Sequence, residues 1–151
     1  MTNDIKYIAK QILTLSKTDN VIAFSCLAEN ESKVKNADFQ QIVEVLKTSG
    51  INFTVVNYDA TYSGAIDIDA TKICDNFSYN FDNIDIPEGS VVLVNLKSIL
   101  GNEELLDSDG KIKKIVLSSK YGKTSFNSLE KGAEILKQNK IEVIGIIANK
   151  R

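Results

Sequence analysis

The sequence lacks histidine and tryptophan, and it has one proline and two cysteines among 151 residues. Without histidine, Ser-His-Asp and Cys-His catalysis, imidazole metal sites and the commonest general base are excluded. Cys26 and Cys74 show no metal-ligand spacing, and we expect no disulfide between them. Any chemistry therefore rests on Asp, Glu, Lys or Tyr side chains or on a bound metal.

Long apolar runs and a strong net charge are also missing. The apolar runs are far shorter than the roughly 20 residues that a membrane-spanning helix needs. Residues 1–4 do not begin a secretory signal, so we expect a cytoplasmic protein. The net charge of -2, with acidic and basic residues interspersed, predicts no nucleic-acid partner.

Apolar strand-like runs alternate with helical patterns. The runs that predict buried strands are 21–24, 53–56, 91–94, 112–117 and 143–147. Apolar residues at helical spacing predict helices at 4–16, 33–48 and 126–136. Gly50 is placed to end the second helix, and Thr124 or Ser125 to begin the last.

This alternation predicts a single α/β domain over residues 1–151, with a three-layer, doubly wound, mainly parallel sheet and helices on both faces. The segment 61–88 is rich in Asp and Asn and fits either a short edge strand or an irregular loop. Ligands of such sheets bind beyond the carboxyl ends of the strands. The segments to inspect are 25–33, 57–59, 95–98 and 118–123.

The first of these segments lies where a phosphate-binding loop would follow the first strand. The working pattern is Gly-x-x-x-x-Gly-Lys-Ser/Thr. Aligned on Lys33, the chain has Leu27 and Ser32 at the glycines and Val34 at the Ser/Thr. Two further motifs follow along the chain: Lys-Thr-Ser at residues 123–125 and Val-Ile-Gly-Ile-Ile-Ala-Asn-Lys at residues 143–150.

Together these motifs resemble the bacterial tyrosine kinases of capsular and exopolysaccharide synthesis, which are relatives of the chromosome-partitioning ATPases. The last third is similar to that family's "K-T-S … helix … G-V-V-x-N-K" pattern. The resemblance implies a P-loop NTPase-like fold. It also implies the positions of a vestigial nucleotide site, which are Ser32, Lys33, Asn57, Asp59, Asn95 and Asn149.

The phosphate loop has lost the residues on which its chemistry depends. Glycines let successive N–H groups curl around an anion, and a side chain at a positive-φ position costs about 1–2 kcal/mol. Val34 has no hydroxyl for Mg²⁺, while Glu29 and Glu31 add negative charge where a triphosphate would lie. Lys33 alone matches the pattern; a solvated lysine opening a helix is its simpler interpretation, and phosphate binding is the alternative.

The metal-binding strand ends have changed in the same direction. The resemblance implies an Asp at each of positions 57 and 95, but the chain has Asn57 and Asn95, and an amide is a poor ligand for Mg²⁺. Asp59 matches the second Asp of an Asp-x-Asp motif, and we interpret it as a helix or loop cap rather than as a metal ligand. Asn149 matches the family's base-contacting asparagine; it either contacts adenine or ends the strand.

Three functions are consistent with this pattern. The first is a non-catalytic pseudo-ATPase or pseudokinase, without catalytic residues, metal or cofactor, acting as an adaptor or regulator in polysaccharide synthesis. Its expected partners are an active kinase-like homologue or the cytoplasmic tail of a membrane chain-length protein, with a homo-oligomer as a further option. The second is a weak ATP-binding protein or kinase that uses Lys33, Asp59, Lys123 and Asn149, with ATP and Mg²⁺ as ligands. The third is an unrelated flavodoxin-like binding module.

Overall fold

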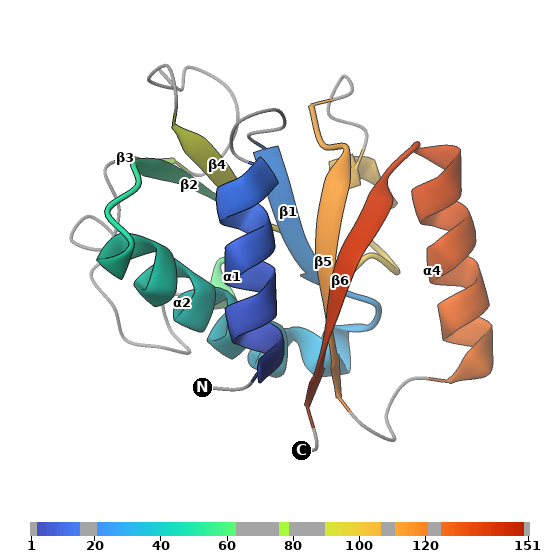
Figure 1. The fold of residues 1–151 in the computed structure, drawn as a ribbon. Coiled ribbons are helices and arrows are strands. Elements are labelled where there is room, and N and C mark those ends of the chain that lie inside the picture. The colour runs from blue at the N-terminus through green and yellow to red at the C-terminus, as the bar shows by residue number, and fades with distance from the viewer. Residues whose placement is uncertain are drawn as a thin grey trace.

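The structure is a computed structural model that describes residues 3–15, 21–62, 76–78, 90–106, 111–120 and 125–149. Figure 1 shows the helices and strands in chain order. They are α1 (Asn3–Leu15), β1 (Val21–Cys26), the 3-10 turn η1 (Glu29–Glu31), α2 (Ser32–Thr48), β2 (Phe53–Asn57), β3 (Asn76–Ser78), β4 (Val91–Asn95), the 3-10 turn η3 (Glu103–Leu106), β5 (Lys114–Lys120), α4 (Phe126–Gln138) and β6 (Glu142–Asn149).

The strands form one six-stranded sheet in the order β3-β2-β4-β1-β5-β6, and every ladder is parallel. This confirms the predicted doubly wound α/β fold. A flavodoxin-like sheet has the order 2-1-3-4-5, in which the first strand lies beside the second. Here β1 lies between β4 and β5, so the flavodoxin-like alternative is wrong.

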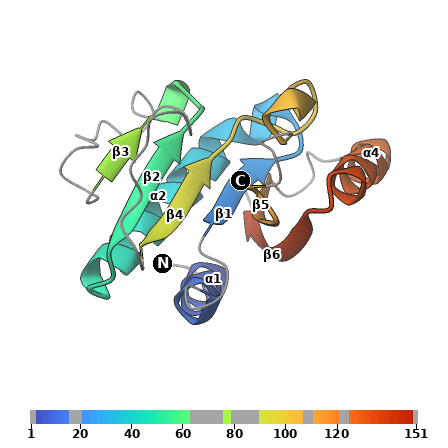
Figure 2. The ribbon, with the colours of Figure 1, turned by 90° about the horizontal axis from the view of Figure 1, so that it is seen from above.

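Alternate residues of the strands face two separate cores. One core joins Ile22, Phe24 and Leu93 to the apolar faces of α1 and α2. The other joins Ala23, Val92, Val94 and their neighbours to Leu136 of α4. Because both faces of β1, β2 and β4 are covered, these strands are buried along almost their whole length and are mostly apolar, as is typical of a parallel sheet. Figure 2 shows the strands side by side from β3 to β6, with α1 below them and α4 next to β6 in this view.

Local signals at the helix ends act as the sequence predicts. Gly50 has φ +77 and follows the last turn of α2, a conformation that costs glycine little. Ser125 is the N-cap of α4, because its Oγ accepts a hydrogen bond from the Ser128 N–H at 3.1 Å. Thr124 and most of 61–88 lie outside the described residues, although β3 is placed at the edge of the sheet beside β2.

Candidate functional site

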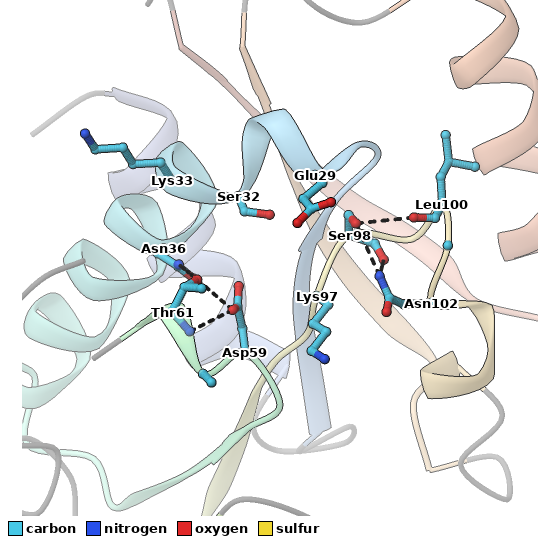
Figure 3. Close-up of a pocket in the computed structure, with 12 residues that line it drawn as sticks. Glu29, Ser32, Lys33, Asn36, Asp59, Thr61, Lys97, Ser98, Leu100 and Asn102 are labelled. Carbon is cyan, nitrogen blue, oxygen red and sulfur yellow. Dashed lines mark hydrogen bonds between the residues drawn. The ribbon is translucent and has the colours of Figure 1, made fainter. Parts of the chain in front are cut away.

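A cavity of about 970 Å³ lies at the carboxyl edge of the sheet, where β1, β2 and β4 end. The chain leaves β1 toward β2 and leaves β4 toward β5, so the winding changes direction between the adjacent strands β1 and β4. Crevices at such points are where open α/β sheets bind ligands. Its lining, drawn in Figure 3, comes from the segments after these three strands: Glu29, Ser32, Lys33, Asn36, Asp59, Ala60, Thr61, Lys97, Ser98, Leu100, Gly101 and Asn102.

Backbone hydrogen bonds hold two of these segments together. The N–H groups of Ile99 and Leu100 donate to the carbonyls of Cys26 and Leu27 at 2.8 and 3.0 Å. The buried Ser25 hydroxyl donates to the Lys97 carbonyl at 2.6 Å. The loop after β4 therefore runs alongside the loop after β1 and fixes the cavity wall.

The loop after β1 avoids the glycine conformations of a phosphate-binding loop. Among the described non-glycine residues, only Lys140 has a positive φ. Ala28 is extended and Ser32 is right-handed helical, so the chain turns through η1 directly into α2. Leu27, at an expected glycine position, is buried beside Gly132 of α4, where an added Cβ would lie 2.2 Å from Leu27 Cδ2. The predicted steric penalty is absent because the loop follows a different path.

Glu31 lies inside this loop, with 1% of its surface exposed. Its carboxylate accepts a hydrogen bond from the Ala28 N–H at 3.3 Å and another from the Lys120 N–H at 2.9 Å. One carboxylate therefore joins the β1–α2 loop to the end of β5. Hydrogen bonds to an ionised acceptor are about twice as strong as neutral ones.

A buried lysine lies beneath the cavity. Lys35 is fully buried, and its Nζ donates to Asp59 Oδ2 and to the Leu96 carbonyl, both at 2.7 Å. Burial lowers the pKa of Lys35 from its ordinary value, and the contact with Asp59 opposes that shift. The ammonium therefore supplies a cation to the acidic residue at the end of β2.

Asp59 uses both of its carboxylate oxygens. Its Oδ1 accepts hydrogen bonds from the Thr61 N–H at 3.0 Å and the Thr61 hydroxyl at 2.7 Å, which caps the turn after β2. Burial by itself raises the pKa of Asp59, but the hydrogen bonds from Lys35 and Thr61 bring that pKa below its ordinary value. The carboxylate is thus held ionised and occupied by protein donors.

Asn57 and Asn95 meet at the ends of adjacent strands. Asn95 Nδ2 donates to Asn57 Oδ1 at 3.0 Å and to Asn36 Oδ1 at 3.3 Å, and Asn57 Oδ1 also accepts the Asp59 N–H. Asn57 Nδ2 and Asn95 Oδ1 are buried without a hydrogen-bond partner. Neutral amides therefore form the floor between β2 and β4, where the resemblance implies aspartates.

The remaining predicted residues are dispersed. Lys33 is exposed, and Figure 3 shows its side chain pointing away from the other labelled residues. Ser32 lines the cavity, whereas Asn149 does not. Asn149 Nδ2 instead donates to Asp38 Oδ2 at 2.8 Å and to the Ser119 carbonyl at 3.3 Å. Lys123 lies outside the described residues.

No activated nucleophile is evident among the described residues. Burial raises the pKa of the Cys26 thiol to about 11, so it stays protonated. The ammonium of Lys35 and the carboxylate of Asp59 are paired with each other. In the described part of the chain, no group of three or more His, Cys, Asp or Glu residues is arranged to hold a metal ion. These residues can hold a loop in one conformation, and they do not fit a hydrated Mg²⁺.

Comparison with known proteins supports the fold assignment. The chain is similar in structure to the BceF tyrosine kinase domain, with a TM-score of 0.64 and 11% sequence identity over 96% of this chain and 74% of that chain. The two chains share a fold, in agreement with the predicted doubly wound parallel sheet. No protein-family model matches the chain, and no curated protein does either.

Sequence reasoning found the cavity edge but missed the role of Lys35 and the contacts of Glu31. The signal for Lys35 is its spacing: it lies on the same helical stripe as Phe39, Ile42 and Leu46, all of which are buried. A lysine on an apolar stripe predicts a buried ion pair. The partner of Glu31 was beyond sequence reasoning because Lys120 lies 89 residues away.

Proposed function

We propose that the chain is a non-catalytic pseudo-ATPase, or pseudokinase, of the polysaccharide-synthesis tyrosine kinase type. It acts as an adaptor or regulator rather than as a catalyst. The proposal joins the kinase-domain-like fold to a site whose strand-end carboxylate, Asp59, is already paired with Lys35.

The observation that carries this proposal is the contact between Lys35 and Asp59. Their 2.7 Å ion pair puts a protein cation against the strand-end carboxylate that would otherwise be available to a metal. A Mg²⁺ ion requires near-octahedral oxygen ligands and repels an adjacent ammonium. Asn57 and Asn95 supply no compensating charge. Mg-ATP therefore has neither its metal ligands nor a glycine loop for its phosphates.

A folded domain without turnover acts through its surface. We propose a cytoplasmic protein in capsular or exopolysaccharide biosynthesis that binds an active kinase-like homologue or the cytoplasmic tail of a membrane chain-length protein. Among the helices in the described part of the chain, none combines the length and the apolar composition needed to span a membrane. Affinity purification from the native cell, followed by mass spectrometry, tests the partner proposal; recovery of neither partner class contradicts it.

The decisive test of the pseudoenzyme is a titration with ATP and Mg²⁺, followed by calorimetry and by thermal unfolding. A ligand at a hundred times its dissociation constant stabilises a protein by about 2.7 kcal/mol, so binding is readily seen. We expect no heat of binding and no shift in melting temperature at millimolar nucleotide. An active kinase domain of the same fold serves as the positive control.

A weak nucleotide binder is the second candidate, and the cavity favours it because about 970 Å³ is ample room for a nucleotide. Lys33 is an exposed cation that lines the cavity, and this function would use it. A melting shift with ATP that disappears in Lys33→Ala supports this candidate and contradicts the pseudoenzyme. A control variant, Lys47→Ala, removes an exposed lysine at the opposite end of α2.

A further inference from the structure

We propose that Glu31 is a resident ligand: its carboxylate occupies an anion cradle between the β1–α2 loop and β5, and a small oxyanion takes its place only when that side chain is removed. This inference rests on the proposed function and deepens it, because it states which group of the chain itself holds the β1–α2 loop where no anionic ligand is bound. The ligand class is a carboxylate or a small inorganic oxyanion.

The cradle is built from two backbone N–H groups that belong to distant parts of the chain. The Ala28 N–H reaches Glu31 Oε1 at 3.3 Å, and the Lys120 N–H reaches Oε2 at 2.9 Å. Each oxygen of the carboxylate has its own donor. Converging backbone N–H groups are a general means of holding an anion, because they supply positive partial charge without a counter-ion.

The backbone turn around Glu31 fixes the point from which its side chain extends. It is the last residue of η1, whose first turn closes through the hydrogen bond from the Glu31 N–H to the Ala28 carbonyl at 3.0 Å. α2 begins at the next residue, so the carboxylate lies at the start of a 17-residue helix. The positive end of that helix dipole adds to the attraction for an anion.

Burial makes the arrangement specific to Glu31. Glu31 is 1% exposed, whereas Glu29, two residues earlier, is exposed. A buried carboxylate without donors is costly, and a buried N–H without an acceptor is costly as well. The carboxylate and these N–H groups therefore stabilise each other, and removal of the side chain leaves at least the two described donors without an acceptor.

The test is chemical rescue of Glu31→Ala, with Glu29→Ala as the matched control that removes the same charge from the same loop. We expect Glu31→Ala to melt roughly 5 °C below the wild type because two buried donors lose their acceptor. Potassium acetate or potassium phosphate at about 50 mM then recovers a large part of that loss, since a ligand that binds only the folded state stabilises it. Potassium chloride at equal ionic strength recovers less, and neither the wild type nor Glu29→Ala shows an oxyanion-specific response.

An equal response of Glu31→Ala to acetate, phosphate and chloride overturns the proposal, as does an oxyanion-specific response in Glu29→Ala. If Glu31→Ala does not fold, Glu31→Gln keeps the shape of the side chain and only one carbonyl acceptor. Amide exchange at Ala28 and Lys120 is then the readout: at least one of the two exchanges roughly tenfold faster than in the wild type. Unchanged exchange at both amides also overturns the proposal.

The outcomes separate this inference from the proposed function. If the wild type binds Mg-ATP while Glu31→Ala is rescued by acetate, the pseudoenzyme fails and the cradle stands. If the wild type binds no nucleotide and Glu31→Ala shows no specific rescue, the cradle fails and the pseudoenzyme stands.

Discussion

Two parts of the molecule differ in how completely they are buried: the β2–β4–β1 side of the sheet with α2, and the β6 side with α4. At β2, β4 and β1, almost every residue is buried, and α2 is buried on several faces, including at Lys35, Asn36 and Asp38. At β6 most residues are exposed or half-buried, and α4 buries only Gly132 and Leu136. Figure 1 shows β6 between α1 and α4 at this outer side of the molecule.

The difference separates a densely packed part of the molecule from a part whose residues are largely exposed to solvent. On the β2–β4–β1 side, polar groups are buried and paired with one another, so each depends strongly on its partner. On the β6–α4 side, large apolar residues such as Phe126 and Ile146 are 72% and 58% exposed. Substitutions of buried residues on the first side are therefore expected to disturb folding, and substitutions of exposed residues on the second side to disturb it little.

The largest effect is expected at the buried ion pair. Lys35→Met removes the cation and leaves the Asp59 carboxylate without its ammonium, and breaking a buried pair costs about 3–5 kcal/mol. Urea unfolding measures the loss. Lys33→Met, on the exposed face of the same helix, is the control and changes the free energy of unfolding by less than about 0.5 kcal/mol.

A double-mutant cycle sharpens this prediction. Lys35→Met combined with Asp59→Asn removes both charges, so much of the lost stability returns relative to Lys35→Met alone. Strict additivity of the two single substitutions would show that the pair is not coupled.

Two glycines test how closely helices approach on the outer side. A Cβ at Gly145 would lie 2.0 Å from Ile8 Cδ1 of α1, and one at Gly132 would lie 2.2 Å from Leu27 Cδ2. Overpacking of this kind costs about 1–3 kcal/mol, while alanine in a helix regains about 1 kcal/mol over glycine. Thermal unfolding is expected to rank Gly145→Ala as more destabilising than Gly132→Ala; the reverse order contradicts the tight approach of α1 to β6.

Two buried aspartates predict opposite responses to acid. The pKa of Asp59 is lowered, so its contribution to stability is present above the ordinary value of 3.8 and is lost as pH falls through the folded pKa. Burial raises the pKa of Asp38, and hydrogen bonds from Asn149 and Ser118 only partly offset it. The cost of ionising Asp38 is therefore relieved as pH falls through its raised pKa toward 3.8.

Unfolding free energies measured in steps from neutral to acid pH separate the two groups. Asp59→Asn should lose stability less steeply below the ordinary aspartate pKa than the wild type does. Asp38→Asn should lack the gain in stability that the wild type shows as the pH falls toward the ordinary aspartate pKa of 3.8. A slope for Asp59→Asn equal to that of the wild type below the ordinary aspartate pKa would show that the assignment is wrong.

The smallest effects are expected on the outer surface. Leu129→Ser and Ile146→Thr change residues that are 48% and 58% exposed, and we expect changes within about 0.5 kcal/mol. Leu93→Ala, in the core below α2, is the contrast and should cost about 2–5 kcal/mol. A loss above 1 kcal/mol at either surface residue would show that this side is better packed than its exposure indicates.

The fold was predictable because its signals are local. Apolar runs such as 91–94 identify strands buried on both faces, and the 39-42-43-46 spacing identifies the buried side of α2. Ser125 and Gly50 mark helix ends through their own side-chain and backbone chemistry. Strand boundaries were less accurate: β6 extends to Asn149 and β5 to Lys120, because polar residues at strand ends pair in the ladder without an apolar signal.

The site was only partly predictable. The strand ends at Asn57, Asp59 and Asn95 do meet, as parallel strands of one sheet require. The signal for the buried cation is the helical spacing of Lys35 with Phe39 and Ile42, whereas the phosphate-loop pattern points to Lys33, two residues earlier. The path of the loop through η1 also depends on packing of Leu27 against α4, a contact that no local pattern encodes.

The contact between Glu31 and Lys120 also bears on the order in which the molecule assembles. The two residues are 89 positions apart, so a chain that has folded only β1, α2 and β2 has no donor from β5 for the carboxylate. Long-range contacts of this kind form late, because a large loop must close first. The β1–α2 loop is thus expected to reach its final conformation only after β5 has joined the sheet beside β1.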